Sequence, residues 1–257
     1  MMRNAFIIFV VAGGLMLTAC GDKGTNPADD ANQALSTEEQ AQIVASQVAE
    51  ENGGIMMEVS NVSGMSDGNA PALGKPAAWD TTITRDNLTY QVSLSFYSRL
   101  GQELPKFMPT QTDSIKYTGI LTGELAARLS SIKVNSNTSL GVGAILSRTI
   151  RINGVSNGTS DFSFSGPSVK TSIKANRTLK VNNVKVPLEA DDYIPVSGTI
   201  EGNIKGTYKH QGVRVQGEGD FEINFTLTFN GDDTATVELG NGATFKLNLK
   251  TGEITVD

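Results

Sequence analysis

The chain of 257 residues has one cysteine, one histidine and one tryptophan, and aromatic residues make up only 6% of it. A single cysteine excludes an intramolecular disulfide, and together with a single histidine it offers too few ligands for a transition-metal centre. A Ser–His–Asp triad would have to use His210, the only histidine, which we interpret as an exposed residue beside a turn. We therefore predict no metal site, no cofactor and no enzymatic activity.

Positive charge is also scarce, because 27 acidic residues outnumber 21 basic ones and the net charge is −6. Scattered charge with an acidic balance argues against a nucleic-acid partner and against electrostatic docking on anionic lipid. The acidic pairs Asp191-Asp192 and Asp232-Asp233 lack the spacing of a calcium loop, so we expect them to be solvated. Glu201 and Glu222 are expected to face each other on the outer, wet surface.

Long apolar runs are absent except at the N-terminus, where a segment from Ala5 to Leu15 follows the cationic Arg3. This run is too short to span a membrane and has the layout of a secretory signal peptide. It ends in the residues Leu17, Thr18, Ala19 and Cys20.

These four residues resemble the lipobox of bacterial lipoproteins, and the resemblance covers residues 1–20. It implies that the Cys20 thiol accepts a diacylglycerol and that cleavage then exposes Cys20 as the new N-terminus. Two or three acyl chains hold a protein stably on a bilayer, whereas one chain does not. The resemblance thus implies a lipid-anchored protein of the bacterial cell envelope, and Gly21 favours the outer over the inner membrane.

The composition divides the chain into a signal peptide (1–19), a flexible tether (20–35) and one β-rich domain (36–257). The tether is small, polar and aperiodic, and such segments bury too little surface to order themselves. The domain is long enough for a sizeable core. Protein partners, oligomeric state and membrane leaflet are left open by the sequence.

The domain begins with an amphipathic helix, which we place at 37–62. Ser36 and Glu39 have the spacing of a capping box, and an apolar stripe follows at helical period. Gly53-Gly54 either splits this segment into two helices or lets one helix approach a neighbour closely; we favour one helix lying on a sheet. Its other face, which we take to include Glu58, is acidic and would be repelled by anionic lipid.

A crossing loop is predicted at 63–86, with Trp79 as an apolar plug. From residue 87 the pattern alternates with period two, which predicts a β-meander over 87–257. Separate strands are expected near 88–96, 113–121, 124–134, 139–152, 169–174, 178–181 and 184–188. Asn157-Gly158 is typical of a hairpin turn. The fold class is therefore mainly β, a curved antiparallel up-and-down meander (half-barrel or open barrel) packed on one N-terminal helix.

Two long alternating strands occupy 196–229, and Gln211-Gly212 is the predicted turn between them. This turn places Phe221 opposite Gly202 and Phe225 opposite Gly198, so that aromatic rings cover bare backbone, as in curved sheets. It also places Lys205 opposite Glu218 on the wet face. The alternation continues through Asn241-Gly242, a hairpin turn, to a last strand at the C-terminus.

Inward glycines leave room beside a sheet, so we predict a candidate ligand cavity in this region. Its lining is Gly198, Gly202, Gly206, Gly217, Gly219, Phe221 and Phe225. The predicted architecture resembles the half-barrel-plus-helix envelope lipoproteins that handle lipids and acylated proteins. That resemblance implies a carrier of a hydrophobic molecule such as a lipid. The alternative is a non-enzymatic adhesion, scaffold or assembly lipoprotein whose helix fills the concave face.

Overall fold

The computed structural model describes residues 35–68, 80–85, 87–126, 130–165, 169–189, 192–212 and 216–255. Within them lie two α-helices, 3-10 turns and a long series of strands. The helical elements are α1 (Thr37–Val48), η2 (Glu50–Asn52), α2 (Ile55–Ser66) and η3 (Ile145–Ser147). The strands are β1 (Asp80–Arg85), β2 (Leu88–Ser98), β3 (Glu103–Leu104), β4 (Thr112–Ala126), β5 (Ser130–Gly143), β6 (Thr149–Ser165), β7 (Val169–Pro187), β8 (Ser197–Gly212), β9 (Gln216–Phe229), β10 (Thr234–Leu239), β11 (Thr244–Asn248) and β12 (Ile254–Thr255).

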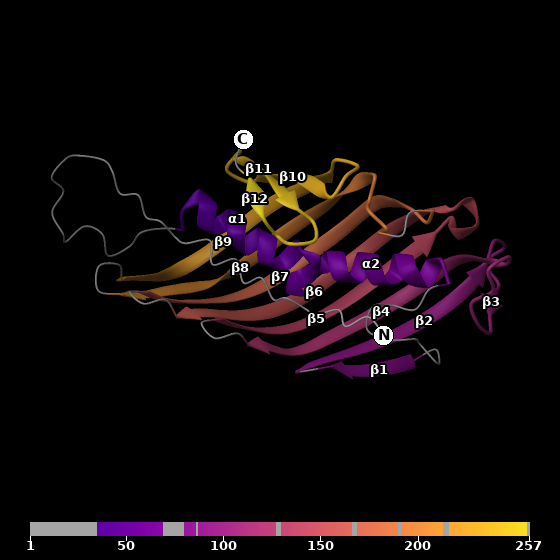
Figure 1. The fold of residues 1–257 in the computed structure, drawn as a ribbon, viewed down its shortest axis with the longest axis horizontal. Coiled ribbons are helices and arrows are strands. Elements are labelled where there is room, and N and C mark those ends of the chain that lie inside the picture. The colour runs from indigo at the N-terminus through magenta and orange to yellow at the C-terminus, as the bar shows by residue number, and fades with distance from the viewer. Residues whose placement is uncertain are drawn as a thin grey trace, which may run out of the picture.

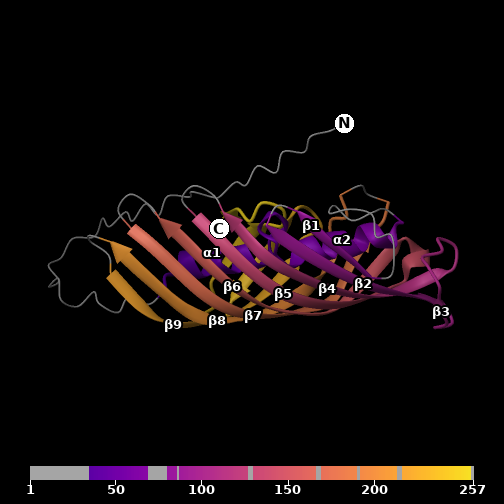
Figure 2. The same cartoon turned by 90° about the horizontal axis from the view of Figure 1, so that it is seen from below.

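All the strands belong to one antiparallel sheet with the order β1-β2-β4-β5-β6-β7-β8-β9-β10-β11-β12, and β3 pairs with β2 off this path. The order follows the chain, so the sheet is an up-and-down meander, and β1 and β12 are its unjoined ends. Seen from below, the strands bow around the helices (Figure 2). The predicted fold class, a curved open half-barrel packed on helical structure, is confirmed.

The helical segment differs from the prediction of one helix over 37–62. The capping box forms, with the Glu39 amide donating to Ser36 Oγ at 3.2 Å and the Ser36 amide donating to Glu39 Oε2 at 2.9 Å. Helix α1 ends at Val48, since Ala49 is extended with ψ 144°, and η2 follows. After η2, Gly53 takes a left-handed φ of +70°, and a Cβ at Gly54 would lie 2.4 Å from the carbonyl carbon of Val48. Only glycine fits both requirements, and the pair therefore divides the segment into α1 and α2.

The two helices lie end to end across the concave face of the sheet, and we call them and η2 the helix layer (Figure 1). The predicted apolar stripe faces the sheet and is fully buried at Val44, Val48, Ile55, Val59 and Val62. Burying a side chain of this size stabilises by about 1.5–3 kcal/mol, so this stripe is what fixes the helices to the sheet.

The C-terminal strands curl over the junction between the two helices. The amide of Glu50 donates to the Leu249 carbonyl at 3.0 Å, and the amide of Glu51 donates to the Lys250 carbonyl at 3.0 Å. These bonds satisfy backbone donors at the start of η2, which an isolated helical turn would leave to water. The helix layer is thus held from the sheet side and from the C-terminal side.

The predicted loop at 63–86 was partly wrong. Helix α2 continues to Ser66, and β1 already occupies Asp80–Arg85, where it pairs with β2. Trp79 and the rest of 69–79 lie outside the described residues.

Several short predicted strands merge into long ones. The runs at 169–174, 178–181 and 184–188 form the single strand β7, and Asn157-Gly158 lies in the middle of β6, where it pairs with β5 and β7. The hairpin prediction there was wrong, because neighbours on both sides supply ladder bonds that hold Asn157-Gly158 extended, whereas a tight hairpin turn needs positive φ. Conversely, the predicted strand 139–152 is broken at η3, between the left-handed residues Ala144 and Arg148.

Likewise the predicted strand 124–134 is not one strand, because β4 ends at Ala126 and β5 begins at Ser130. The two strands pair antiparallel, with Ala126 opposite Ser131. A period-two pattern continues through such a turn whenever its apolar residues keep the same parity, so the pattern alone does not show the reversal.

The β8–β9 pairing is shifted by four residues from the predicted register. Phe225 lies opposite Gly202, and Phe221 lies opposite Gly206. Strand β8 runs through the predicted Gln211-Gly212 turn, and Gln211 pairs with Gln216, the first residue of β9. Residues 213–215, which connect the two strands, lie outside the described residues. An even shift keeps each side chain on its predicted face, so the inward and outward assignments were right although the partners were wrong.

Charges on the outer face explain which register is adopted. Lys205 pairs with Glu222 at 3.1 Å, and Lys209 pairs with Glu218 at 2.9 Å. The predicted register would have placed Glu201 opposite Glu222 and Lys209 opposite Arg214. Like charges directly across a ladder destabilise it, whereas opposite charges add stability.

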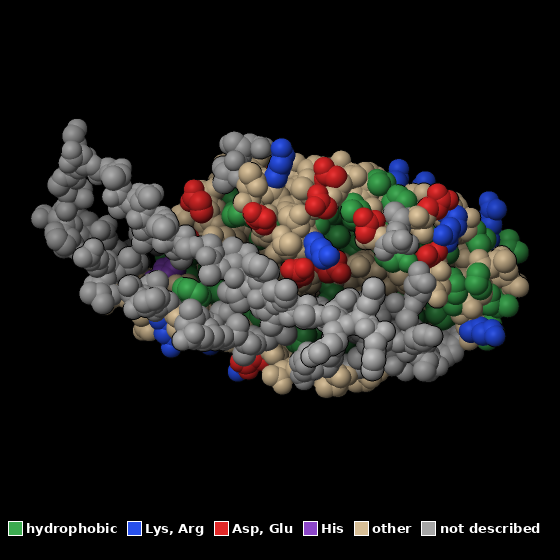
Figure 3. Space-filling model, in the orientation of Figure 1, with side chains coloured by type: hydrophobic (Ala, Val, Ile, Leu, Met, Phe, Trp, Pro, Cys, Tyr) green, Lys and Arg blue, Asp and Glu red, His purple; other side chains and the backbone are tan. Residues whose placement is uncertain are grey.

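The Asn241-Gly242 turn joins β10 to β11 as predicted, with Gly242 at φ +85°. On the face shown in Figure 3, acidic and basic side chains are interspersed rather than gathered by sign. Among the described residues, no helix is long and apolar enough to cross a membrane.

Candidate functional site

A band of small and polar side chains crosses the concave face under the helix layer, and we call it the polar band. Its members stand at inward positions of β4 to β7, where an antiparallel sheet over a core normally carries apolar residues. They are Gly119, Ser136, Thr138, Ser156, Gly158, Ser160 and Arg177. The register makes them neighbours, since Gly119 pairs with Thr138, Thr138 with Ser156, Ser136 with Gly158, and Gly158 with Arg177.

Glu58 of α2 meets one end of this band. Its side chain is buried, and its Oε2 accepts hydrogen bonds from the Tyr90 hydroxyl at 2.6 Å and from the Tyr117 hydroxyl. Asn61, on the next turn of the helix, donates to the Tyr90 hydroxyl at 3.3 Å. Gly119 leaves room for this group, because a Cβ there would lie 2.5 Å from the Tyr117 hydroxyl and 3.0 Å from Glu58 Oε2.

Burial determines the protonation of this carboxyl group. Desolvation raises the pKa of Glu58 from its ordinary value of 4.5 to about 7, and the Tyr90 hydrogen bond and the charge of Arg177 oppose that rise. Burial, the Glu58 charge and the hydrogen bond to Glu58 also raise the pKa of Tyr90 well above its ordinary range, so the hydroxyl stays a donor. Near neutral pH, Glu58 therefore exchanges between a neutral acid and a buried carboxylate.

Arg177 of β7 meets the other end of the band. Its Nη1 donates to the Gln47 carbonyl at 2.6 Å, and the Gln47 amide donates to Ser160 Oγ at 3.0 Å. Gln47 lies in the last turn of α1, whose carbonyls have no partner within the helix, so a cation there complements both the free acceptor and the helix dipole. Burial lowers the pKa of Arg177 to about 10, which leaves the guanidinium charged at neutral pH.

Two buried polar atoms here have no hydrogen-bond partner, namely Ser136 Oγ within the band and Glu58 Oε1 at its end. Buried polar atoms in proteins are nearly always paired, and exceptions often mark bound water, ions or functional strain. Ser136 lies between the two charged ends. The point where a Cβ at Gly158 would stand is 3.1 Å from the Ser136 Cβ and 3.2 Å from Arg177 Nε.

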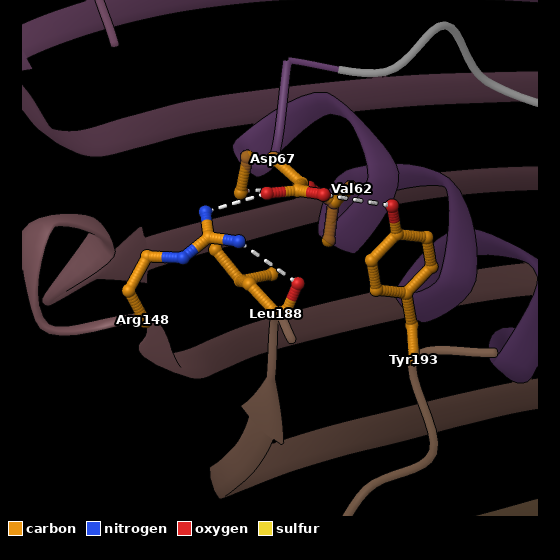
Figure 4. Close-up of polar contacts among 6 residues, drawn as sticks. Val62, Asp67, Arg148, Leu188 and Tyr193 are labelled. Carbon is orange, nitrogen blue, oxygen red and sulfur yellow. Dashed lines mark hydrogen bonds and ion pairs between the residues drawn. The ribbon is translucent and has the colours of Figure 1, made fainter. Parts of the chain in front are cut away.

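A second polar cluster holds the far end of α2 to the loops of the sheet, and we call it the clasp (Figure 4). Asp67, which caps α2, pairs with Arg148 Nη1 at 2.5 Å and accepts from the Tyr193 hydroxyl at 3.3 Å. Arg148 Nη2 also donates to the Leu188 carbonyl at 3.0 Å. Arg148 and Tyr193 both have positive φ, a costly backbone state that persists only where surrounding contacts impose it.

The predicted cavity residues lie on the concave face, but most of the space beside the glycines is occupied. A Cβ at Gly202 would lie 2.0 Å from the Phe225 ring, and one at Gly219 would lie 3.0 Å from the Tyr208 hydroxyl. Gly206 is limited by the backbone of the next strand, since its Cβ would lie 1.9 Å from the Lys174 carbonyl oxygen.

The two glycines at the extremes of the predicted lining differ from these three. Gly198 sits at an irregularity of the β7–β8 ladder with φ +113°, next to the Val184 backbone. Gly217 has nothing within 4 Å of its Cβ position. Open space is thus shown at Gly217, toward the turn between β8 and β9.

Gly217 pairs with His210, and next to this pair the concave face carries apolar side chains that are mostly half-buried. Directly paired residues on neighbouring strands form a row that we call the distal row. It runs from Ile132 through Phe162, Ile173 and Tyr208 to Gly219, and of these side chains only Tyr208 is fully buried. The ends of β8 and β9 reach past the first turn of α1 here (Figure 1). This end of the concave face is where an apolar chain could gain contacts.

His210 is placed differently from the prediction of an exposed turn residue. It lies within β8 on the concave side, where Thr171 Oγ1 is 3.1 Å from its Nδ1 and Glu39 Oε1 is 3.5 Å from its Nε2. It therefore ties the start of α1 to the sheet. The stretch Gly64-Met65-Ser66-Asp67-Gly68 has the spacing of a nucleophile elbow, but Ser66 ends a helix and donates to the Val62 carbonyl at 2.7 Å.

The acidic residues singled out in the sequence serve local structure. Asp232 accepts from the Thr234 amide at 2.8 Å, and Asp233 accepts from the Asn248 side chain at 3.1 Å. Glu201 lies opposite Thr226 rather than Glu222, and it pairs with Lys180 at 3.6 Å. Asp191 lies outside the described residues, among which no cluster of metal-binding side chains occurs.

The lipidation residues Leu17, Thr18, Ala19 and Cys20 also lie outside the described residues, as does the predicted tether up to residue 34. Leu35, the last residue assigned to that tether, is buried in the core at 7% exposure. The ordered domain thus begins at least one residue earlier than predicted.

Comparison of this chain with protein-family models, with curated proteins and with solved structures found no match. The assignment of the polar band as a candidate site is therefore based on its geometry alone. The prediction that Glu58 belongs to the acidic, outer face of the helix was wrong, because its side chain is buried on the apolar stripe between Ile55 and Val62. Arg177 was not singled out in the sequence, although it breaks the apolar period of its strand between Ala175 and Leu179.

Proposed function

We propose that the chain is a lipid-anchored protein of the bacterial envelope, in the outer rather than the inner membrane, that binds a hydrophobic ligand such as a lipid on the concave face of its half-barrel. The observation that supports this most is the distal row, which offers half-buried apolar side chains on adjacent strands. Apolar side chains that keep part of their surface in water gain free energy when an apolar ligand covers that surface. Binding is to be expected there, with no chemical step.

The helix layer would act as the cover of this site. It contacts the sheet through apolar side chains and through the few hydrogen bonds of the polar band, and the clasp and the His210 contact hold its two ends. A long ligand would extend from the distal row under α1, where Ser160, Ala175 and Gly206 are small. Because Ser160, Ala175 and Gly206 are small, little contact between the sheet and α1 is lost there when the helix is displaced.

Equilibrium binding of a fluorescent fatty acid to the purified full-length chain tests the proposal. Ile173→Gln places an amide in the distal row, and we expect it to weaken binding about tenfold, because the ligand would then bury an unpaired polar group. The matched control is Val155→Gln, which changes an exposed apolar residue on the outer face of the sheet. Equal loss in both variants, or no binding by the unaltered protein, would refute the proposal.

The anchor is tested separately. Cys20→Ser removes the only thiol, so we expect it to abolish incorporation of labelled fatty acid and to release the protein from the membrane fraction. Persistent membrane association would contradict the assignment of Cys20 as the anchored residue.

A filled-core scaffold or adhesion protein is the second candidate. The Phe225 ring against Gly202 and the fully buried helical stripe favour it, because both show side chains of the protein itself occupying the concave face. That function predicts no lipid binding by any variant.

A further inference from the structure

The sheet and the helix layer contribute opposite kinds of groups to the polar band. The sheet contributes the Arg177 guanidinium and the hydroxyls of Tyr90, Tyr117 and Ser136, all of which can donate. The helix layer answers with acceptors, namely the Gln47 carbonyl for Arg177 and the Glu58 carboxyl group for the tyrosines. This part of the sheet is rich in hydrogen-bond donors and carries the charge of Arg177. In the closed arrangement its acceptors are the Glu58 carboxyl group and the Gln47 carbonyl of the helix layer.

Displacing the helix layer would leave those donors on the sheet without acceptors. A buried guanidinium without a partner is strongly unfavourable, so a ligand that opens the cover must bring acceptors of its own. An anionic head group, such as a carboxylate, phosphate or sulfonate, supplies charge to Arg177 and several acceptor oxygens to the hydroxyls.

Ser136 already has the geometry of such a site. Its Oγ is buried and has no partner while the cover is in place. Its Cβ lies 3.1 Å, and Arg177 Nε lies 3.2 Å, from the point where a Cβ at Gly158 would stand. A hydroxyl that only stabilised the fold would be expected to have a partner. Ser136 is thus a donor whose acceptor is absent from the closed arrangement.

We propose that the polar band binds the anionic head group of the ligand, in the place that Gln47 and Glu58 occupy in the closed arrangement, while the apolar tail lies along the distal row. This rests on the proposed function. The ligand class is then an anionic amphiphile, and the Glu58 carboxylate competes with its head group. Protonation of Glu58 would remove that competing charge, and no other acidic side chain is among the groups that contact Glu58 from α2, β2, β4 or β7.

Calorimetric titration of the purified full-length chain with dodecane sulfonate, dodecanol and methanesulfonate tests this inference. We expect dodecane sulfonate to bind at least about tenfold more tightly than dodecanol, as a charge-assisted hydrogen bond would provide. Methanesulfonate alone should bind far more weakly than either. Equal affinity for sulfonate and alcohol would overturn the head-group site, and tight methanesulfonate binding would make it a site for a free anion instead.

The variants locate the site. Arg177→Gln should remove the preference for the sulfonate, and Ser136→Ala should reduce it about fivefold while leaving the fold intact, because its hydroxyl has no partner to lose. Unchanged sulfonate affinity in Ser136→Ala would overturn the inference even if Arg177→Gln failed to fold.

Glu58→Gln supplies the opposite change. It should strengthen sulfonate binding at pH 8 and abolish the gain in affinity that the unaltered protein is expected to show between pH 8 and pH 6. Weaker sulfonate binding by this variant would contradict the competition. If neither dodecane compound binds any variant, the proposed function fails and this inference fails with it; if dodecanol binds as well as the sulfonate, only the inference fails.

Discussion

At the scale of single residues, the polar chemistry of the concave face comes from side chains that interrupt an apolar pattern. Glu58 stands on the buried stripe of α2, and Arg177 stands on the inward side of β7. Gly119 and Gly158 make their burial feasible, because a side chain at either glycine would collide with the neighbouring polar group. Gly119 therefore leaves the space that Glu58 needs, and Gly158 leaves the space that Arg177 needs.

Glu58 gives a pH dependence of stability with a definite sign. The folded protein holds the Glu58 proton up to a pKa of about 7, whereas the unfolded chain releases it near 4.5, so unfolding releases a proton between these values. The free energy of unfolding should therefore fall as pH rises through this window, by roughly 3 kcal/mol in total.

Urea unfolding of the unaltered protein and of Glu58→Gln at several pH values measures this effect. The difference between the two curves should be small at pH 5 and should grow toward pH 8, where the variant is the more stable. Glu201→Gln, at an exposed position, should keep the slope of the unaltered protein. A difference that does not change with pH would contradict the buried position of Glu58.

Gly202 and Gly217 give a matched pair for the occupied and open parts of the face. Gly202→Ala would place a Cβ 2.0 Å from the Phe225 ring and should lower the free energy of unfolding by about 1–3 kcal/mol. Gly217→Ala meets nothing within 4 Å and should be neutral or slightly stabilising. Thermal unfolding of the two variants checks this, and equal destabilisation would mean that Gly217 is also enclosed.

At the scale of elements, the sequence predicts which face of a helix or strand is buried better than it predicts where the element begins and ends. The helical stripe from Val44 to Val62 and the period-two strands were predicted on their correct faces, because burial imposes both periods. The β8–β9 register was not, since a shift of four residues leaves every side chain on the same face. The outer pairs Lys205–Glu222 and Lys209–Glu218 favour the observed register.

The break predicted between the runs 169–174 and 178–181 is absent from β7 for a reason that lies far away in the chain. Polar residues at inward positions, such as Arg177, end an apolar run in the sequence but not in the sheet, because the helix layer supplies their partners. Those partners lie 130 residues away in the chain, so no local pattern contains them. The candidate site was therefore largely outside the reach of sequence reasoning.

The clasp holds the C-terminal end of α2 to the sheet, so a change in it tests how that end of the helix layer is fixed. Arg148→Gln removes the ion pair with Asp67, and because both side chains are partly exposed we expect at most about 1 kcal/mol of global destabilisation. Hydrogen exchange of the last turn of α2 should nevertheless accelerate, since that turn loses its tie to the sheet. Lys180→Gln, which removes an outer pair on β7, should leave α2 unchanged, and faster exchange there as well would argue against a specific role of the clasp.

At the scale of the whole molecule, the account joins an open antiparallel sheet to a helix layer that closes its concave face. Most of that layer is held by apolar contact, which is non-directional. The directional contacts are those of the polar band, the clasp and His210, together with the two backbone hydrogen bonds from Glu50 and Glu51 to the C-terminal strands. A cover built in this way can separate from the sheet by breaking few hydrogen bonds. This division of contacts is the basis for proposing a ligand site on the concave face.

Photolabelling of the purified protein with a diazirine-bearing fatty acid tests the central claim most directly. After illumination, peptide mass spectrometry locates each adduct on the chain. The account predicts adducts in the segments that carry the distal row, at Ile132, Phe162 and Ile173, and a loss of these adducts when unlabelled fatty acid competes. Adducts confined to outward residues such as Val155, or adducts that unlabelled fatty acid does not displace, would contradict it.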